Sequence, residues 1–139
     1  MIERTLVNIK PDAVAKNIMG EIIKRIENAE YRIVSLYKIQ LTKEAAAAFY
    51  AVHKGQYFYE PLIEFMTSGP CVPMVVEGEN AVHGIRELVG NTDPGKAAEG
   101  TIRHDFGETV RRNAVHASDS LETAQVEIPF FFKGKHLVF

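Results

Sequence analysis

The sequence predicts an α+β sandwich, in which helices pack on a four-stranded, mainly antiparallel sheet in the ferredoxin-like manner. Segments with the pattern of strands alternate with segments of helical spacing, in the order β-α-β-α-α-β-α-loop-β-α. The length of 139 residues and a hydrophobic fraction of 46% suit one domain with a packed core over residues 1–139. We expect the helices to cover one face of the sheet.

The predicted strands are short apolar or alternating segments bounded by turn residues. Residues 5–9 form an apolar run that stops near Pro11, and Asp12 can cap the element that follows. The other strands are rich in residues that favour extended structure. They are expected at residues 31–41, at 72–77 and around Val115.

Helical spacing and terminal signals predict the helices. Ile22, Ile23 and Ile26 share one helical face, and Gly90 lies beyond a helix end. The helices are expected at residues 19–29, 42–49, 60–66, 80–89 and 119–128. Residues 91–112 hold Pro94 and several glycines, and are expected to form a long irregular loop, a kind of segment that is often functional.

Composition excludes several classes of function. Sixteen basic and eighteen acidic residues give a formal charge of −2, which favours neither a nucleic-acid surface nor a membrane-binding face. No apolar run could span a bilayer, and the N-terminus lacks the apolar core of a signal peptide. We therefore expect a cytoplasmic protein without a membrane partner. The single cysteine, Cys71, is expected to be buried and inert.

Several familiar motifs are broken or absent. Residues 90–97 nearly match the phosphate-binding pattern G-x-x-x-x-G-K-[ST], but Ala97 replaces the final hydroxyl residue and the preceding segment is helical. There is no G-x-G-x-x-G for a dinucleotide and no G-x-S-x-G for a serine hydrolase. The histidines show no H-E-x-x-H, and one cysteine does not make a structural zinc site.

His116 is the most informative single position. Ala114 and Val115 precede it, and small polar residues follow at 118–120. This layout suits a nucleophilic imidazole on a strand, with the carboxylate of Glu127 in the next helix available to orient it. Taken alone, one histidine between small residues is by default an ordinary structural or exposed histidine.

Cationic and aromatic residues allow a phosphate and base site near this histidine. A phosphate clamp could form from Lys10, Arg86, Arg103 and Asn113. Each cation alone fits a solvated surface charge, and spacing does not show that they converge. Tyr50 and Phe58 flank a helix junction, where they either fill the core or offer a face on which a base stacks.

Several blocks of the chain resemble the nucleoside diphosphate kinase family. The block around that family's phosphorylated histidine appears as Asn113-Ala114-Val115-His116-Ala117-Ser118-Asp119-Ser120. The N-terminal block appears as Ile9-Lys10-Pro11-Asp12-Ala13-Val14. Further matches lie at residues 3–5, 49–54, 65–70, 77–81 and 100–106, so the similarity runs from about residue 2 to about residue 132.

The resemblance implies an enzyme that passes the γ-phosphate of a nucleoside triphosphate, such as ATP or GTP, to a nucleoside or deoxynucleoside diphosphate. It implies Mg²⁺ on the nucleotide phosphates and a ping-pong course through a phosphohistidine. Carried over by position, His116 is the nucleophile, supported by Ser118 and Glu127. Phosphate and sugar contacts fall on Lys10, Tyr50, Arg86, Thr92, Arg103 and Asn113. Phe58 is implied to stack on the base, with Leu62 beside it.

The resemblance also implies a homo-oligomer, because family members assemble as dimers built into tetramers or hexamers. The aromatic residues 130–132 and the apolar residues 137–139 would favour association. The alternative is a catalytically weak, nucleotide-binding regulatory protein of the same fold. Such a protein would be expected to lose His116, Lys10 or an arginine of the site, and all are present.

The chain departs from the family pattern at a few positions. Residues 55–57 read Gly-Gln-Tyr where an acidic residue, Arg and Pro are usual, and Glu99 replaces a frequent Pro. Ala117 stands where Gly is frequent. Glu30 replaces a common helix-ending Gly, which removes a favourable residue from the helix C-terminus. None of these positions is assigned to the chemistry.

Overall fold

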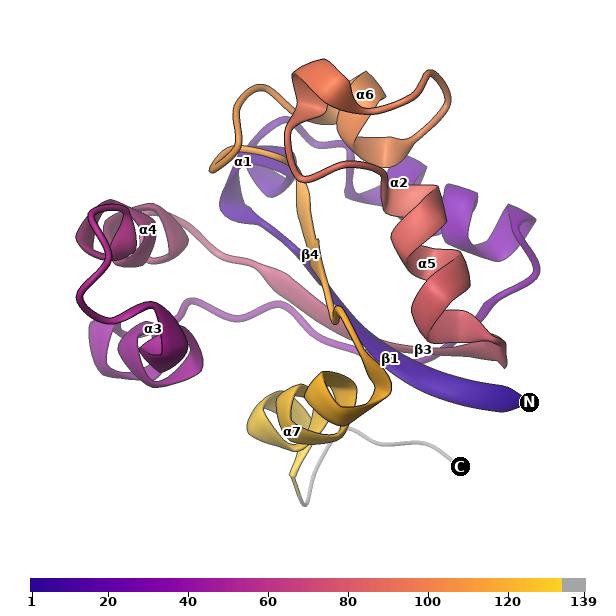
Figure 1. Cartoon of the computed structure of the whole chain (residues 1–139), viewed down its shortest axis with the longest axis horizontal. Coiled ribbons are helices and arrows are strands. Elements are labelled where there is room, and N and C mark those ends of the chain that lie inside the picture. The colour runs from indigo at the N-terminus through magenta and orange to yellow at the C-terminus, as the bar shows by residue number, and fades with distance from the viewer. Residues whose placement is uncertain (134–139) are drawn as a thin grey trace.

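The computed structural model describes residues 1–133, and Figure 1 shows their layered arrangement. The middle layer is a four-stranded antiparallel sheet with the strand order β2-β3-β1-β4. The strands are β1 (Ile2–Ile9), β2 (Arg32–Leu36), β3 (Val72–Glu79) and β4 (Val115–Ala117). The predicted ferredoxin-like α+β sandwich is confirmed.

Helices cover both faces of the sheet, not the one face expected. One face carries α1 (Pro11–Ala15), α2 (Met19–Asn28), α5 (Ala81–Val89) and α6 (Ile102–Phe106). The other face carries α3 (Lys43–Phe49), α4 (Tyr59–Met66) and α7 (Leu121–Phe132). The reason is visible in β1, where Val7 belongs to one buried core and Leu6 to the other. A strand that is apolar on both sides needs a covering layer on each.

Three strands differ in length from the prediction, and β3 runs two residues past its predicted end, to Glu79. β1 begins at Ile2 because its pairing with β3 continues through polar residues as far as Glu79. β2 ends at Leu36, opposite Met74 of β3, and a register shift between Ile33 and Ser35 makes its ladder irregular. The rest of the predicted strand is irregular, with an isolated bridge at Ile39.

Helix α7 continues to Phe132, past the predicted end at residue 128. Pro129 lies inside it, although proline cannot donate to the preceding turn. Buried contacts hold the last turn in place: Phe132 is fully buried, and Tyr37 Oη donates to the carbonyl of Phe131 at 2.6 Å. Residues 137–139, expected to favour association, lie outside the described residues.

Two local predictions are wrong. Lys10, not Asp12, is the N-cap of α1, and the Asp12 carboxylate accepts a hydrogen bond from the backbone of Ala114. Residues 91–112 are not wholly irregular, since they contain the 3-10 turn η2 (Pro94–Lys96) and helix α6. Thr101 caps α6 by accepting from the backbone N–H of His104 at 3.3 Å. A second 3-10 turn, η1, spans Ala51–His53.

Within residues 1–133, none of the helices has the length and apolar character that crossing a bilayer requires. The cysteine prediction is confirmed, because the Cys71 side chain is fully buried. Burial raises the pKa of its thiol, which keeps the thiol protonated and unreactive.

Glu30 offers a test of backbone strain. It follows α2 with a φ of 70°, in the left-handed region that disfavours residues with a Cβ. Glu30→Gly should raise the free energy of unfolding by about 0.5–1 kcal/mol, measured by urea denaturation. The control Glu30→Ala removes the same carboxylate without relieving φ, and should be no more stable than the wild type. Equal stability of the Gly and Ala variants would contradict the strain.

Candidate active site

A pocket of about 1030 Å³ opens beside β4. Most of the predicted site residues line it: Lys10, Tyr50, Phe58, Leu62, Arg86, Thr92, Arg103, His116 and Glu127. Asn113 and Ser118 are buried behind the lining, and each hydrogen-bonds to a lining residue. The fold therefore brings together residues from both ends of the chain and from both helical layers.

The pairing of β4 with β1 sets the place of His116. Its backbone lies opposite Asn8, and its side chain meets α7. Oε1 of Glu127 contacts Nε2 of His116 at 2.9 Å and accepts from Oγ of Ser118 at 2.7 Å. A carboxylate partner places the imidazole proton on Nε2, so the lone pair of the ring lies on Nδ1. With 22% of its side chain exposed, His116 remains accessible to a ligand.

The outer edge of β4 orients two arginines. Nη2 of Arg103 donates to the carbonyl of Val115 at 2.9 Å, and Nη1 of Arg86 donates to the carbonyl of Ala117 at 3.2 Å. Arg103 also donates to the carbonyl of Gly90 at 3.0 Å. These bonds use backbone acceptors that a further strand would otherwise occupy. Both guanidinium groups are thereby fixed by the carbonyls of the residues that precede and follow His116.

Lys10 adds a third cation to the pocket. The residue is 7% exposed, and its Nζ donates to Oδ1 of Asn113 at 2.8 Å. Burial, followed by the positive charge of Arg103, lowers the pKa of Lys10 to about 8. Burial and the charge of Arg86 lower the pKa of Arg103 to about 10. Such crowding of positive charge in a pocket is typical of a site that binds an anion.

Aromatic side chains form the opposite wall. Phe58 lies before α4, with its ring centroid 5.1 Å from that of His53 and 5.5 Å from that of Tyr57. Tyr50 is nearly buried, and its hydroxyl has no hydrogen-bond partner among the described residues. Burial raises the pKa of this phenol, so it stays protonated and can donate. The wall offers flat apolar surface and one unused polar group.

The sequence did not single out Phe49, which lies at the end of α3. Its ring meets the His116 imidazole edge-on, with centroids 5.5 Å apart, and also contacts Phe130 and Phe131. Val110 and Asp119 also line the pocket without having been predicted. The expectation that residues 91–112 form a functional loop was the one signal for Val110.

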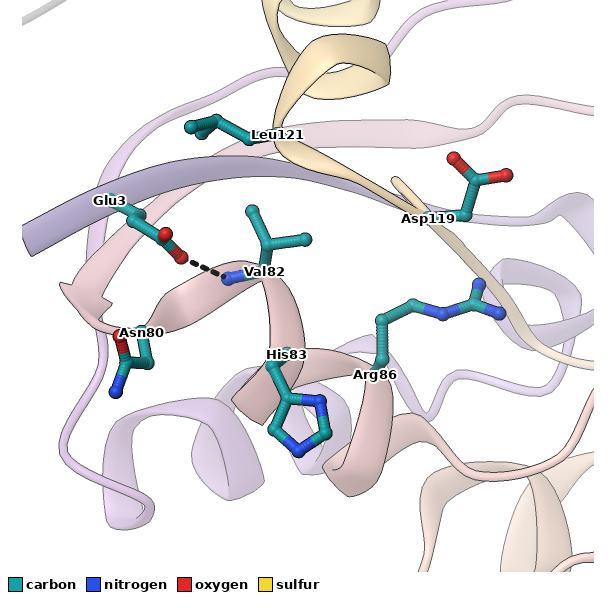
Figure 2. A pocket seen from close by; sticks show the side chains of 7 residues that line it. All are labelled: Glu3, Asn80, Val82, His83, Arg86, Asp119 and Leu121. Carbon is teal, nitrogen blue, oxygen red and sulfur yellow. Dashed lines mark hydrogen bonds between the residues drawn. The ribbon is translucent and has the colours of Figure 1, made fainter. Parts of the chain in front are cut away.

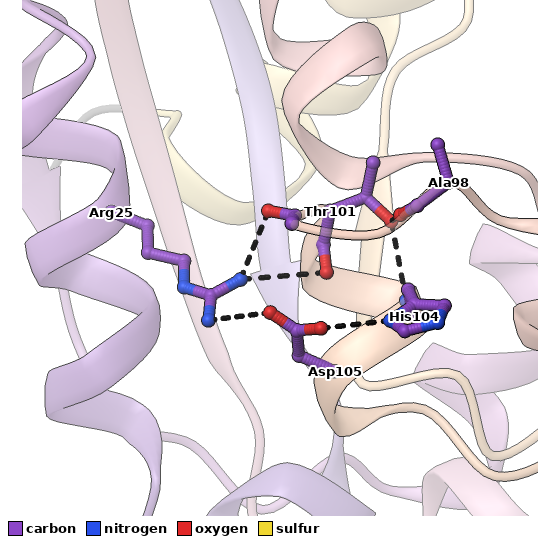
Figure 3. A network of polar contacts seen from close by, with 6 residues as sticks. Arg25, Ala98, Thr101, His104 and Asp105 are labelled. Atoms are coloured by element: carbon purple, nitrogen blue, oxygen red, sulfur yellow. Dashed lines mark hydrogen bonds and ion pairs between the residues drawn. The ribbon is translucent and has the colours of Figure 1, made fainter.

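A polar network holds α6, and with it Arg103, against α2 (Figure 3). Arg25 donates to the carbonyls of Gly100 and Thr101 at 3.1 and 3.4 Å and forms an ion pair with Asp105 at 2.7 Å. The hydrogen bond from His104, followed by that from Arg25, lowers the pKa of the Asp105 carboxyl. The segment that carries Arg103 is therefore tied at both its start and its end.

A smaller pocket of about 550 Å³ adjoins the first and shares Arg86 and Asp119 with it (Figure 2). Glu3 borders it and accepts from the backbone N–H of Val82 at 3.1 Å, near the start of α5. Arg86 thus borders both pockets.

Comparisons with known proteins agree over nearly the whole chain. The family model described as nucleoside diphosphate kinase matches residues 3–137. The nucleoside diphosphate kinase of Nitratiruptor sp. is 58% identical over 137 residues, which cover 99% of this chain and 100% of that protein. That of Wolinella succinogenes is 54% identical, covering 98% and 99%. The crystal structure of the Aquifex aeolicus nucleoside diphosphate kinase aligns with a TM-score of 0.96 at 44% identity, covering 99% and 100%.

Burial of Lys10 makes stability depend on pH. Its pKa falls from 10.5 to about 8 on folding, so the unfolded chain binds more protons between these values and the free energy of unfolding rises with pH there. The whole of this gain in the free energy of unfolding is present above pH 10.5, and it is lost as the pH falls through 8. Its size is about 3 kcal/mol.

Urea denaturation between pH 7 and pH 10.5 measures the effect. Lys10→Met keeps most of the side-chain volume and removes the titrating group, so its stability should rise less over this range than that of the wild type. The same pH slope in both proteins would show that Lys10 is not the group responsible.

Proposed function

Because the chain belongs to the nucleoside diphosphate kinase family and is an enzyme of that kind, we propose that it transfers the γ-phosphate of a nucleoside triphosphate through a phosphohistidine at His116. One observation carries this mechanism. An imidazole oriented by Glu127 and Ser118 lies in the same pocket as Lys10, Arg86 and Arg103. A nucleophile beside an anion-binding cluster is what phosphoryl transfer to the protein needs.

The reaction has two halves. In the first, Nδ1 of His116 attacks the γ-phosphorus, the bond from that phosphorus to the bridging oxygen breaks, and the nucleoside diphosphate leaves. In the second, a terminal oxygen of another nucleoside diphosphate attacks the phosphorus on His116, the bond from phosphorus to Nδ1 breaks, and its electron pair returns to Nδ1, which restores the free imidazole. Glu127 holds the proton on Nε2 throughout and stabilises the positive charge that the ring gains.

The cations stabilise the charge that spreads over the phosphoryl oxygens during transfer. Arg86 and Arg103 are fixed by backbone carbonyls of β4, so little reorganisation is needed when the phosphate arrives. Lys10 is held by a neutral amide, and its charge is therefore available to a phosphate oxygen. The free hydroxyl of Tyr50 and the side chain of Thr92 supply further donors in the pocket.

Phe58 and Leu62 would hold the base through its faces. Stacking tolerates any base, because every base has a π-face. This arrangement supports a broad range of substrates, including ATP, GTP and other nucleoside and deoxynucleoside diphosphates. It also lets one site serve both halves of the reaction.

Magnesium would travel on the nucleotide phosphates. The carboxylates of Asp119 and Glu122 line the pocket and fit such an ion, which usually takes one or two carboxylates together with phosphate oxygens and waters. When bound, Mg²⁺ supplies charge neutralisation to the phosphates and holds them in a productive arrangement.

We also propose that the chain forms a homo-oligomer built from dimers, as a tetramer or hexamer. β2 lies at an edge of the sheet, where it pairs with β3 alone among the described strands. An open edge strand with an exposed apolar residue, here Leu36, favours association.

Phosphorylation of His116 tests the mechanism directly. Incubation with ATP labelled at the γ-phosphate should leave an acid-labile label on the protein, which an added nucleoside diphosphate removes. His116→Ala should abolish both the label and the transfer activity. His83→Ala is the control, because His83 is an exposed histidine on α5, and it should behave as the wild type. Full transfer activity in His116→Ala would contradict the mechanism.

Replacing Phe58 tests the stacking role. Phe58→Ala should weaken nucleotide binding by about 1–3 kcal/mol with little change in base preference. Titration calorimetry with adenosine, guanosine and cytidine diphosphates measures both effects. Phe58→Tyr keeps the ring and should retain most of the affinity. A sharp new base preference in Phe58→Ala would contradict stacking.

A further inference from the structure

A strained turn lies directly before the strand that carries His116. Ala114 has a φ of 77°, in the left-handed region, although it is not a glycine. The N–H of Val115 donates to the carbonyl of Asn113 at 2.9 Å, which closes a three-residue γ-turn around Ala114. The form of γ-turn with positive φ is rare and strained. Such a backbone persists only where the surroundings impose it.

The surroundings that impose it lie at the junction of β1 and α1. The N–H of Lys10 donates to the carbonyl of Ala114 at 2.8 Å, and Oδ2 of Asp12 accepts from the N–H of Ala114 at 3.1 Å. Ala114 is fully buried and Asp12 is 2% exposed, so these bonds are shielded from water. Both polar backbone groups of the strained residue are thus bonded to this junction.

Ala114 has a site residue on each side. Asn113 precedes Ala114, and Oδ1 of Asn113 accepts from Nζ of Lys10 at 2.8 Å. His116 follows Ala114 by two residues. The geometry points to Asp12 as a positioning residue, which holds Ala114 in its left-handed conformation and thereby sets His116 and Lys10 for phosphoryl transfer. This inference rests on the proposed function.

The charge of Asp12 supports the same role. The carboxylate raises the pKa of Lys10, against the lowering by burial and by Arg103. Its second oxygen, Oδ1, has no hydrogen-bond partner among the described residues. A buried carboxylate that leaves one oxygen unused is poorly explained by stability alone, since burying a charge without full pairing is unfavourable.

The test uses the full chain and measures the single-turnover rate of His116 phosphorylation by ATP labelled at the γ-phosphate. Asp12→Ala should slow this step at least tenfold. Asp12→Asn keeps an oxygen acceptor for the N–H of Ala114, and its phosphorylation rate should fall less than that of Asp12→Ala. The double variant Asp12→Ala/Ala114→Gly should recover much of the lost rate, because glycine adopts a positive φ without the hydrogen bond to Asp12. Glu3→Ala is the matched control: it removes another carboxylate that accepts a backbone N–H near a helix start, and should stay within twofold of the wild type.

A second measurement does not depend on activity. Amide hydrogen exchange at Val115 and His116, followed by NMR, should accelerate in Asp12→Ala and slow again in the double variant. If Asp12→Ala fails to fold, both measurements are made on Asp12→Asn and on the double variant Asp12→Asn/Ala114→Gly. An unchanged rate in folded Asp12→Ala, or a double variant as slow as the single one, overturns the inference. Absence of phosphorylation in the wild type contradicts the proposed function instead. The exchange data then test by themselves whether Asp12 holds Ala114 in its left-handed conformation.

Discussion

The short ladder between β4 and β1 is the contact on which the site depends. It joins Val7 with Ala117, Asn8 with His116 and Ile9 with Val115. This pairing directs His116 towards Glu127 in α7, while the carbonyls of Val115 and Ala117 receive the arginines of α6 and α5. One three-residue strand therefore presents His116 through a side chain and fixes Arg103 and Arg86 through its backbone carbonyls. The edge that would otherwise attract another strand is occupied by guanidinium groups.

The choice of a neutral partner for Lys10 shapes the electrostatics of the pocket. Asn113 accepts from the ammonium group without cancelling its charge, whereas a carboxylate there would compete with a phosphate for it. The folded protein thus holds a buried cation next to Arg103, at a cost that appears as the lowered pKa of Lys10. A polyanionic ligand removes that cost. The cations are kept in place by neutral carbonyls and an amide, which leaves their charge for the ligand.

The sequence was sufficient to predict the fold class and to name residues that the fold gathers around one pocket. It was insufficient to predict the contacts that hold those residues in place. Short apolar and alternating segments locate the strands. The helix predicted from residue 42 begins directly after it, because the side chain of Thr42 caps α3 by accepting from the backbone N–H of Ala45. The end of α7 was missed because tertiary packing of Phe132 overrides the breaking tendency of Pro129. Asp12 was assigned to the wrong partner, since its acceptor role depends on Ala114, which lies far along the chain. Spacing along the chain carries no information on such distant contacts.

Those distant contacts also bear on the order in which the molecule assembles. The bonds from Lys10 to Asn113 and from Ala114 to Asp12 join residues 103 and 102 positions apart. Closing segments of this length carries an entropic penalty that only the other packed elements can offset. During synthesis, β1 and the aromatic wall leave the ribosome long before β4 and α7. The cluster of Lys10, Arg86 and Arg103 beside His116 is thus complete only after β4 and α7 have joined β1, so a chain that lacks these late segments has no histidine oriented by Glu127.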